Sequence, residues 1–184
     1  MSVDRGEARG TAGTDPAATV TNVVLAGLGG QGVIKASDIL ADAALRAGRD
    51  VKKSELHGMS QRGGSVTSDV RFGRTASDLV RSPMVPRGEA DYLVVLAASE
   101  IEVARPLLRS GGVVLAPDLI PDADLPNKRS LNVALLGALS VYLDLPVEAM
   151  LEAVRAALPE RLHAVHERAF ALGRKVAARQ GTIL

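Results

Sequence analysis

The sequence predicts an α/β layered fold with an all-helical C-terminal part. Apolar stretches typical of strands alternate with helical patterns before residue 118, and only helical patterns follow Pro126. A glycine-rich turn also joins the first predicted strand to the first predicted helix. With 184 residues, 47% of them apolar, the chain is long enough for one domain with a substantial core.

Residues 1–18 are expected to form a disordered tail, because their Gly, Ala, Thr, Asp and Arg residues show no apolar periodicity. A single domain is predicted over residues 19–184. Its first element is the β-branched run 19–26, which favours a buried central strand. Apolar residues at helical spacing follow over 33–47, and Gly48 marks the end of that helix.

The middle of the chain alternates strands with a helix. Val66, Val70 and Phe72 occur at even offsets, which is typical of a half-buried strand. A helix is expected between the last two strands, over 99–109. The strands are predicted at 50–56, 66–72, 91–97 and 112–118.

The C-terminal part is expected to be helical because apolar residues recur there every three or four positions. We expect its last helix to cover the sheet or a partner. That helix carries the stripe Leu162, Val165, Ala169, Leu172 and Val176.

Composition excludes several classes of function. The 22 basic and 21 acidic residues give a net charge of +1, and only four residues are aromatic, so a nucleic-acid partner is not expected. No cysteine is present, so these residues form no disulfide and hold no thiolate-bound cluster. No apolar stretch reaches the roughly 20 residues of a membrane helix, and no secretory signal is apparent, so a cytoplasmic protein is expected.

The turn after the first strand, LAGLGGQGVIKAS, carries Gly27, Gly29 and Gly32 in the G-x-G-x-x-G spacing. Backbone amides at such a helix start bind anions. Glu55, 23 residues after Gly32, is placed to bind a ribose, as in a nicotinamide dinucleotide site. Gly30 and Gln31 make the turn more open and polar than that reading requires. A phosphate of another coenzyme, or a tight turn that binds nothing, are the alternatives.

A second glycine-rich loop, ELHGMSQRGGSV, lies between two predicted strands. Arg62 offers a rigid donor fork for phosphate or carboxylate, and glycines leave backbone amides exposed. His57 is expected to position a ligand rather than transfer a proton; it could equally fix the loop. A polar turn held by its own hydrogen bonds is the alternative. The candidate ligand-binding residues of this loop are Ser60, Gln61, Arg62, Gly63, Gly64 and Ser65.

Taken together, GLGGQGV and HGMSQRGGSV resemble the gamma-type subunit of 2-oxoacid:ferredoxin oxidoreductases, and within that family its indolepyruvate branch, where the small subunit is called beta. The segments SPMVPRGEADYLVVL, NVALLGAL and RAFALG agree with the same family. The resemblance implies a three-layer α/β/α fold with a Rossmann-like start. It also implies oxidative decarboxylation of an aryl 2-oxoacid to an acyl-CoA, with electrons passing to ferredoxin.

By the same resemblance, thiamine diphosphate, its magnesium ion and the iron–sulfur clusters belong to a large partner subunit. This chain would help to shape the site and hold coenzyme A as a co-substrate. Its cofactor-binding residues would be Gly27, Gly29, Gly30, Gln31 and Gly32, which cradle the diphosphate, while Arg62 pairs with a phosphate or with the substrate carboxylate. No metal site is expected in this chain.

The sequence departs from the family in two places. Residues 113–131 are short by roughly one βα unit, and His166 stands where the family often has asparagine. His163 and His166 form an H-x-x-H pair, which is expected to be two surface histidines. A free-standing NAD-binding Rossmann domain and a structural partner without a ligand are the rival interpretations.

Overall fold

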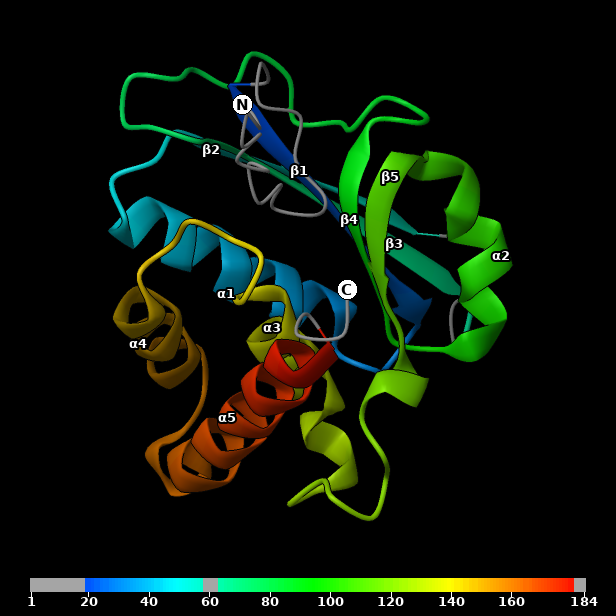
Figure 1. Ribbon diagram of the computed structural model, residues 1–184, viewed down its shortest axis with the longest axis vertical. Coiled ribbons are helices and arrows are strands. Elements are labelled where there is room, and N and C mark those ends of the chain that lie inside the picture. Colours follow the sequence, from blue (N-terminus) through cyan, green and yellow to red (C-terminus); the bar gives the residue numbers. More distant parts are fainter. Residues whose placement is uncertain (1–18, 58–62, 181–184) are drawn as a thin grey trace, which may run out of the picture.

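The computed structural model describes residues 19–57 and 63–180. In this part of the chain, five strands form one mixed sheet in the order β2-β3-β1-β4-β5 (Figure 1). β1 lies in the centre, antiparallel to β3 and parallel to β4. The strands are β1 (Val20–Leu28), β2 (Val51–His57), β3 (Ser65–Gly73), β4 (Ala90–Val95) and β5 (Leu108–Leu115).

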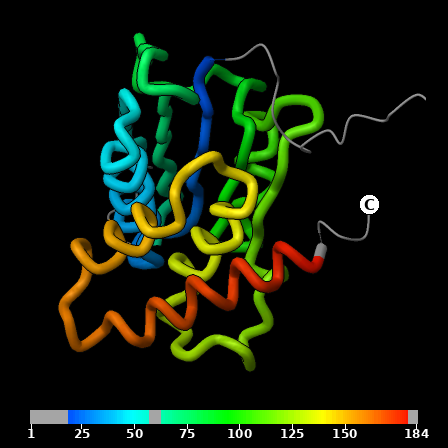
Figure 2. Tube along the Cα trace, turned by 60° about the vertical axis from the view of Figure 1, so that its left-hand side comes forward, coloured from blue at the N-terminus to red at the C-terminus, as the bar shows by residue number. Residues whose placement is uncertain are grey.

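Helices cover both faces of the sheet (Figures 1 and 2). One face packs against the larger set, α1 (Val33–Arg46), α3 (Leu131–Leu139), α4 (Val147–Ala157) and α5 (His163–Gln180). The other face packs against α2 (Ile101–Ala104) and the 3-10 turns beside it. The fold class predicted from the sequence, α/β with a helical C-terminal part, is therefore confirmed, including the three layers that the family resemblance implied.

The two faces of β1 belong to different cores. Val23 and Leu25 point into the larger core under α1, while Val24 and Ala26 point into the smaller core under α2. All four side chains are fully or almost fully buried. This explains why the strand is a continuous apolar run instead of an alternating one, since a central strand of a three-layer fold meets no water on either face.

Helices α3 and α5 cross at two glycines. A Cβ atom on Gly137 of α3 would overlap the backbone carbonyl of Phe170, and one on Gly173 of α5 would overlap the carbonyl of Ala134. Without side chains at these positions the two helix backbones come into direct contact. Both glycines lie in segments that the sequence shares with its family, NVALLGAL and RAFALG, so the close crossing gives those segments a physical reason.

The expected helix over 99–109 is confirmed only in part, as a short α-helix between two 3-10 turns over 98–107. Only Ile101–Ala104 is α-helical, a 3-10 turn follows at Arg105–Leu107, and β5 already begins at Leu108. Pro106 explains the break, because proline has no amide to donate to the carbonyl one helical turn earlier. The strand expected at 112–118 is likewise displaced, since the 3-10 turn that starts at Pro117 follows its end at Leu115.

The remaining predicted strands and the three C-terminal helices are confirmed, with ends shifted by a few residues. The predicted tail, residues 1–18, lies outside the described residues. Among the helices that the structure describes, none has the length and apolar character needed to cross a membrane.

Gly137→Ala is expected to lower the free energy of unfolding by at least about 2 kcal/mol, because the overlap with Phe170 forces the helices apart. The gain in helix propensity, about 1 kcal/mol, is too small to offset this. Gly88→Ala is the matched control: Gly88 has φ 78° but open space around its Cα, so its cost is limited to about 1–2 kcal/mol of backbone strain. Urea unfolding of both variants measures the difference, and a Gly137→Ala protein as stable as wild type would contradict the close crossing.

Candidate functional site

The two glycine-rich loops meet at the end of β1. Antiparallel pairing places Leu28, the last residue of β1, opposite Ser65, the first residue of β3. Gly29 N then donates a hydrogen bond of 2.9 Å to Gly64 O. A Cβ atom on Gly29 would lie 3.3 Å from Gly63 N, so the absence of a side chain lets the loops approach. The structure thus brings together Gly29, Gly63 and Gly64, which the sequence placed in one site.

The first loop is a tight turn closed by Gln31. Its backbone amide donates to Leu28 O at 3.1 Å, and its side-chain Oε1 accepts from Leu28 N at 2.8 Å. Gly30 and Gly32 adopt φ values of 93° and 84°, in the left-handed region that favours glycine. Gln31 therefore holds the turn through both its backbone amide and its side-chain Oε1.

Helix α1 begins at this turn with an uncapped positive end. Gly32 is its N-cap residue, and within the described residues no side chain caps its first amides. The first turn also contains no acidic residue. Four amides at a helix start lack intrahelical partners, and the helix dipole adds partial positive charge there. This end of α1 is thus suited to an anion.

A cavity of about 580 Å³ opens beside the start of α1, and we call it the α1 pocket. Its charged lining residues are Lys35, Lys128 and Arg129, and no acidic residue of the described chain is among those that line it. Lys128 pairs only distantly with Asp122, at 3.8 Å, and both side chains are well exposed. The full lining is Gly30, Gln31, Gly32, Lys35, Leu96, Lys128, Arg129, Leu131, Asn132, Val133, Leu158 and His166.

Asn132 fastens the start of α3 to the glycine turn. Its Nδ2 donates to Gly32 O at 3.3 Å, and its Oδ1 accepts from Val133 N at 2.9 Å. A Cβ atom on Gly32 would lie 2.6 Å from Asn132 Nδ2, so glycine is required for this contact. Asn132 was not among the site residues predicted from the sequence. The one feature that could have pointed to it is its polar side chain at the start of the apolar segment NVALLGAL.

His166 corrects the expectation of two surface histidines. Its side chain on α5 lines the α1 pocket and is only 9% exposed. Burial lowers its pKa below the usual value. His163 instead lies 2.8 Å through Nε2 from Leu158 O. Among the residues that the structure describes, no group of three or more His, Asp or Glu side chains is placed to hold a metal ion.

The second loop is only partly described. Ser60, Gln61 and Arg62 lie outside the described residues, and His57 is the last residue of β2, opposite Val66. Ser65 Oγ donates to Glu100 Oε2 at 2.7 Å, and Glu100 is a buried carboxylate. The hydroxyl predicted to bind a ligand therefore ties the loop to the turn after β4.

The sheet order speaks against a nicotinamide dinucleotide site. Strand β3 lies between β1 and β2, so Glu55 on β2 is two strands from the glycine turn, about 10 Å at ordinary strand spacing. In a dinucleotide-binding fold the acidic residue comes from the strand next to β1. Glu55 forms an ion pair with Lys53, which also contacts Asp38 of α1.

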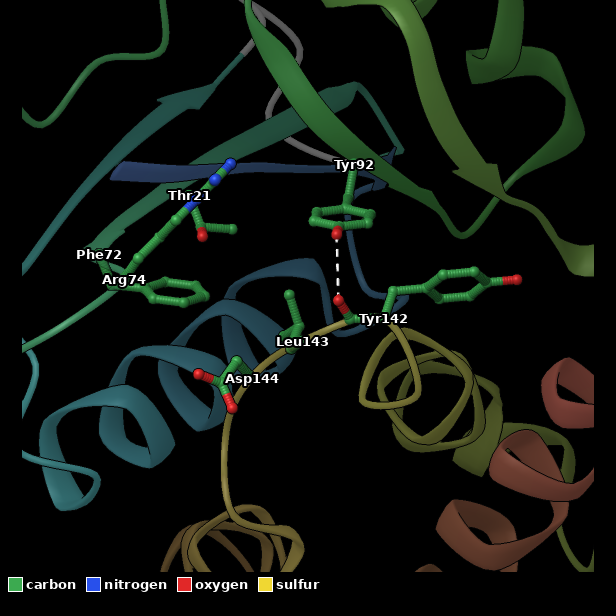
Figure 3. A pocket seen from close by; sticks show the side chains of 7 residues that line it. All are labelled: Thr21, Phe72, Arg74, Tyr92, Tyr142, Leu143 and Asp144. Carbon is green, nitrogen blue, oxygen red and sulfur yellow. Dashed lines mark hydrogen bonds between the residues drawn. The ribbon is translucent and has the colours of Figure 1, made fainter. Parts of the chain in front are cut away.

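A second, smaller cavity of about 180 Å³ lies at the opposite end of β1, near its start (Figure 3). Thr21, Phe72, Arg74, Tyr92, Tyr142, Leu143 and Asp144 line it. Tyr92 Oη donates to the backbone carbonyl of Tyr142 at 3.1 Å, and the two rings lie 6.2 Å apart. Burial raises the pKa of Tyr92 to about 12. These contacts fasten the segment after α3 to the sheet.

Comparison with known proteins connects this geometry to a family. The family model described as pyruvate ferredoxin/flavodoxin oxidoreductase matches residues 22–126. Indolepyruvate oxidoreductase subunit IorB of Thermococcus kodakarensis is 35% identical, covering 85% of this chain and 95% of that protein. The subunit of the same name from Methanothermobacter thermautotrophicus is 32% identical, covering 85% and 97%.

Solved structures share the fold. The gamma subunit of keto/oxoacid ferredoxin oxidoreductase from Geobacter sulfurreducens superposes with a TM-score of 0.69 at 24% identity, over 88% of this chain and 98% of that one. The 2-oxoglutarate:ferredoxin oxidoreductase from Magnetococcus marinus, with 2-oxoglutarate, coenzyme A and succinyl-CoA bound, gives 0.75 at 21% identity. The match covers 88% of this chain but only 32% of that longer chain.

The fold is a three-layer α/β fold of the kind found in the gamma subunit from Geobacter sulfurreducens. The chain belongs to the pyruvate ferredoxin/flavodoxin oxidoreductase family, as the small subunit of an oxoacid:ferredoxin oxidoreductase. It is one part of a multi-subunit enzyme. The sequence also led us to expect a shortened chain, and the alignment with the Thermococcus relative gives the size of the difference. That alignment spans 198 positions but includes only 85% of the 184 residues, about 156. The relative therefore carries about 40 residues without a counterpart in this chain.

Tyr92→Phe is expected to lower the free energy of unfolding by about 1 kcal/mol at pH 7, through loss of the hydrogen bond to Tyr142 O. Above pH 10 the effect declines, and it reverses by about pH 11. The phenol stays neutral in the folded protein up to about pH 12 but ionises near pH 10 when unfolded. Its contribution is thus complete below pH 10, and wild type loses about 1.4 kcal/mol per pH unit from pH 10 to 12 relative to the variant.

Urea unfolding at pH 7 and pH 11 measures this crossover. Tyr142→Phe is the control, because Tyr142 contributes its backbone carbonyl, which the substitution keeps. Equal pH dependence of wild type and Tyr92→Phe would contradict the buried, neutral phenol.

Proposed function

We propose that this chain is the small subunit of an indolepyruvate-type oxidoreductase that converts an aryl 2-oxoacid to an acyl-CoA and passes electrons to ferredoxin. The observation that carries the proposal is the similarity to two subunits named indolepyruvate oxidoreductase IorB along 95% and 97% of their lengths. The substrate class comes from those names. The role of the chain within the complex comes from its own residues.

The electron-transfer and thiamine chemistry is assigned to a large partner subunit. These 184 residues contain no cysteine to bind a cluster. They also contain no Gly-Asp-Gly sequence followed by paired asparagines to hold a diphosphate through magnesium. The residues present therefore do not fit thiamine diphosphate or an iron–sulfur cluster, and no step of the reaction is assigned to such a group here.

The residues do fit the phosphates of coenzyme A. The first turn of α1, after Gly32, presents amides that no described side chain caps, and the α1 pocket adds three cationic side chains without a carboxylate in its described lining. Such an environment favours a diphosphate over a neutral ligand. The chain would hold the phosphate end of the coenzyme and orient its thiol towards the partner subunit. Ser60, Gln61 and Arg62 remain predicted ligands of the second loop, with His57 predicted to position the substrate.

The assembly itself is tested by purification. A tagged full-length chain, expressed in its native host, is expected to copurify with a larger cysteine-rich chain in a brown complex that contains thiamine diphosphate. The complex should reduce ferredoxin with an aryl 2-oxoacid and coenzyme A, and Arg62→Ala should raise the KM of one of these two ligands. A colourless homo-oligomer without thiamine diphosphate would overturn the proposal.

Gly30→Ala in the same complex is expected to raise the KM for coenzyme A at least about tenfold, because a Cβ atom there would face the open space where the diphosphate binds. Gly48→Ala is a close control at the other end of α1. Gly48 also has positive φ, 75°, and open surroundings, so backbone strain is matched while the pocket is untouched. Equal KM values for the two variants would argue against coenzyme binding at the glycine turn.

A further inference from the structure

The α1 pocket contains a histidine that the glycine turn does not explain. His166 is more than nine-tenths buried, and its Nδ1 is enclosed without a hydrogen-bond partner among the described residues. The α5 helix that carries it is held in place, since Phe170, one turn further on, lies against Gly137 of α3. Neither ring nitrogen has a hydrogen-bond partner among the described residues, and only Nδ1 is enclosed, so a ligand in the pocket could supply a partner to Nε2 alone.

The position of Nδ1 decides the tautomer of this ring. An enclosed N–H without an acceptor is less tolerated than an enclosed lone pair, so the proton resides on Nε2. Nε2 is then the atom that a ligand can reach, and it acts as a donor.

Burial keeps the His166 ring neutral by lowering its pKa. Lys35 of α1 and Lys128 and Arg129 of the segment before α3 line the same pocket, and no acidic residue of the described chain joins them there. Positive neighbours disfavour an imidazolium, and burial acts in the same direction. His166 therefore offers a hydrogen bond without adding charge.

From these features we propose that the α1 pocket is a phosphate-binding site in which the Nε2–H of neutral His166 donates to a phosphate oxygen. The cations and the amides of α1 supply the attraction, and the histidine fixes one oxygen from the α5 side. This proposal rests on the proposed function for one point only, that the phosphate belongs to coenzyme A; a free phosphate anion has the same chemistry.

The ring itself gives the most direct test. In the ¹⁵N-labelled full-length chain, the nitrogen shifts of His166 are expected to report the Nε2–H tautomer near neutral pH. Addition of inorganic phosphate or pyrophosphate should move the Nε2 and Nε2–H signals. His163, whose Nε2 already contacts Leu158 O, should not respond, and His163→Gln and His166→Gln assign the two rings.

Variants measure what the hydrogen bond contributes. His166→Leu is expected to weaken pyrophosphate binding about tenfold, the scale of a hydrogen bond to a charged group. His166→Gln retains a donor close to the place of Nε2 and should remain within about threefold of wild type. Because the lost group is neutral, His166→Leu should leave the salt dependence of binding unchanged, whereas Lys128→Ser with Arg129→Ser should reduce it.

Experiments with coenzyme A and dephospho-coenzyme A distinguish a phosphate site at His166 from the role of the chain in binding the coenzyme. Equal responses of His166 to coenzyme A and dephospho-coenzyme A would assign the pocket to the diphosphate, and a response to coenzyme A alone would assign it to the ribose phosphate. Coenzyme A binding to the complex with the His166 signals unmoved by every probe would overturn the present inference alone. Absence of coenzyme A binding, with a clear response to phosphate, would instead overturn the coenzyme role and leave the phosphate site standing.

Discussion

The hydrogen bond from Gly29 N to Gly64 O determines where the parts of the site lie. It exists because β3 runs antiparallel to β1 and starts where β1 ends, so the two glycine loops emerge side by side. The same insertion of β3 moves β2 away from the turn and separates Glu55 from it. The pairing of β3 with β1 thus brings the two glycine loops together. It also separates the acidic residue of β2 from the glycine turn, whereas a nicotinamide dinucleotide site needs the two close together.

The elements of the fold were predictable where a local pattern specifies them. The continuous apolar run of β1 reflects burial on both faces of the strand. The apolar spacing of α1 and the apolar stripe of α5 reflect burial on one face of each helix. Strand order was not predictable, because residues that favour strands do not encode which neighbour they pair with. The expected helix at 99–109 is shorter than predicted for a local reason, since Pro106 has no amide to continue the helical hydrogen bonds.

The candidate site divides in the same way. Glycines with positive φ, such as Gly30 and Gly32, could be predicted from the sequence because they lie close together within one turn. Asn132 contacts the turn and His166 lines the same pocket, both from helices about 100 residues or more further along the chain, and no local sequence pattern predicts this proximity. His166 even sits beside the apolar stripe of α5, where a surface position was the simpler interpretation. The crossing at Gly137 and Gly173 is what brings it inward.

The short connection before α3 has a consequence for the pocket. The Thermococcus relative carries about 40 residues without a counterpart in this chain, and the sequence predicts the shortening at 113–131. Lys128 and Arg129 lie within that segment and line the α1 pocket directly. A short connection that begins at the end of β5 and must reach the start of α3 has few paths, and Asn132 anchors its far end to Gly32. The connection therefore supplies two of the three cationic side chains, lysine or arginine, that line the α1 pocket.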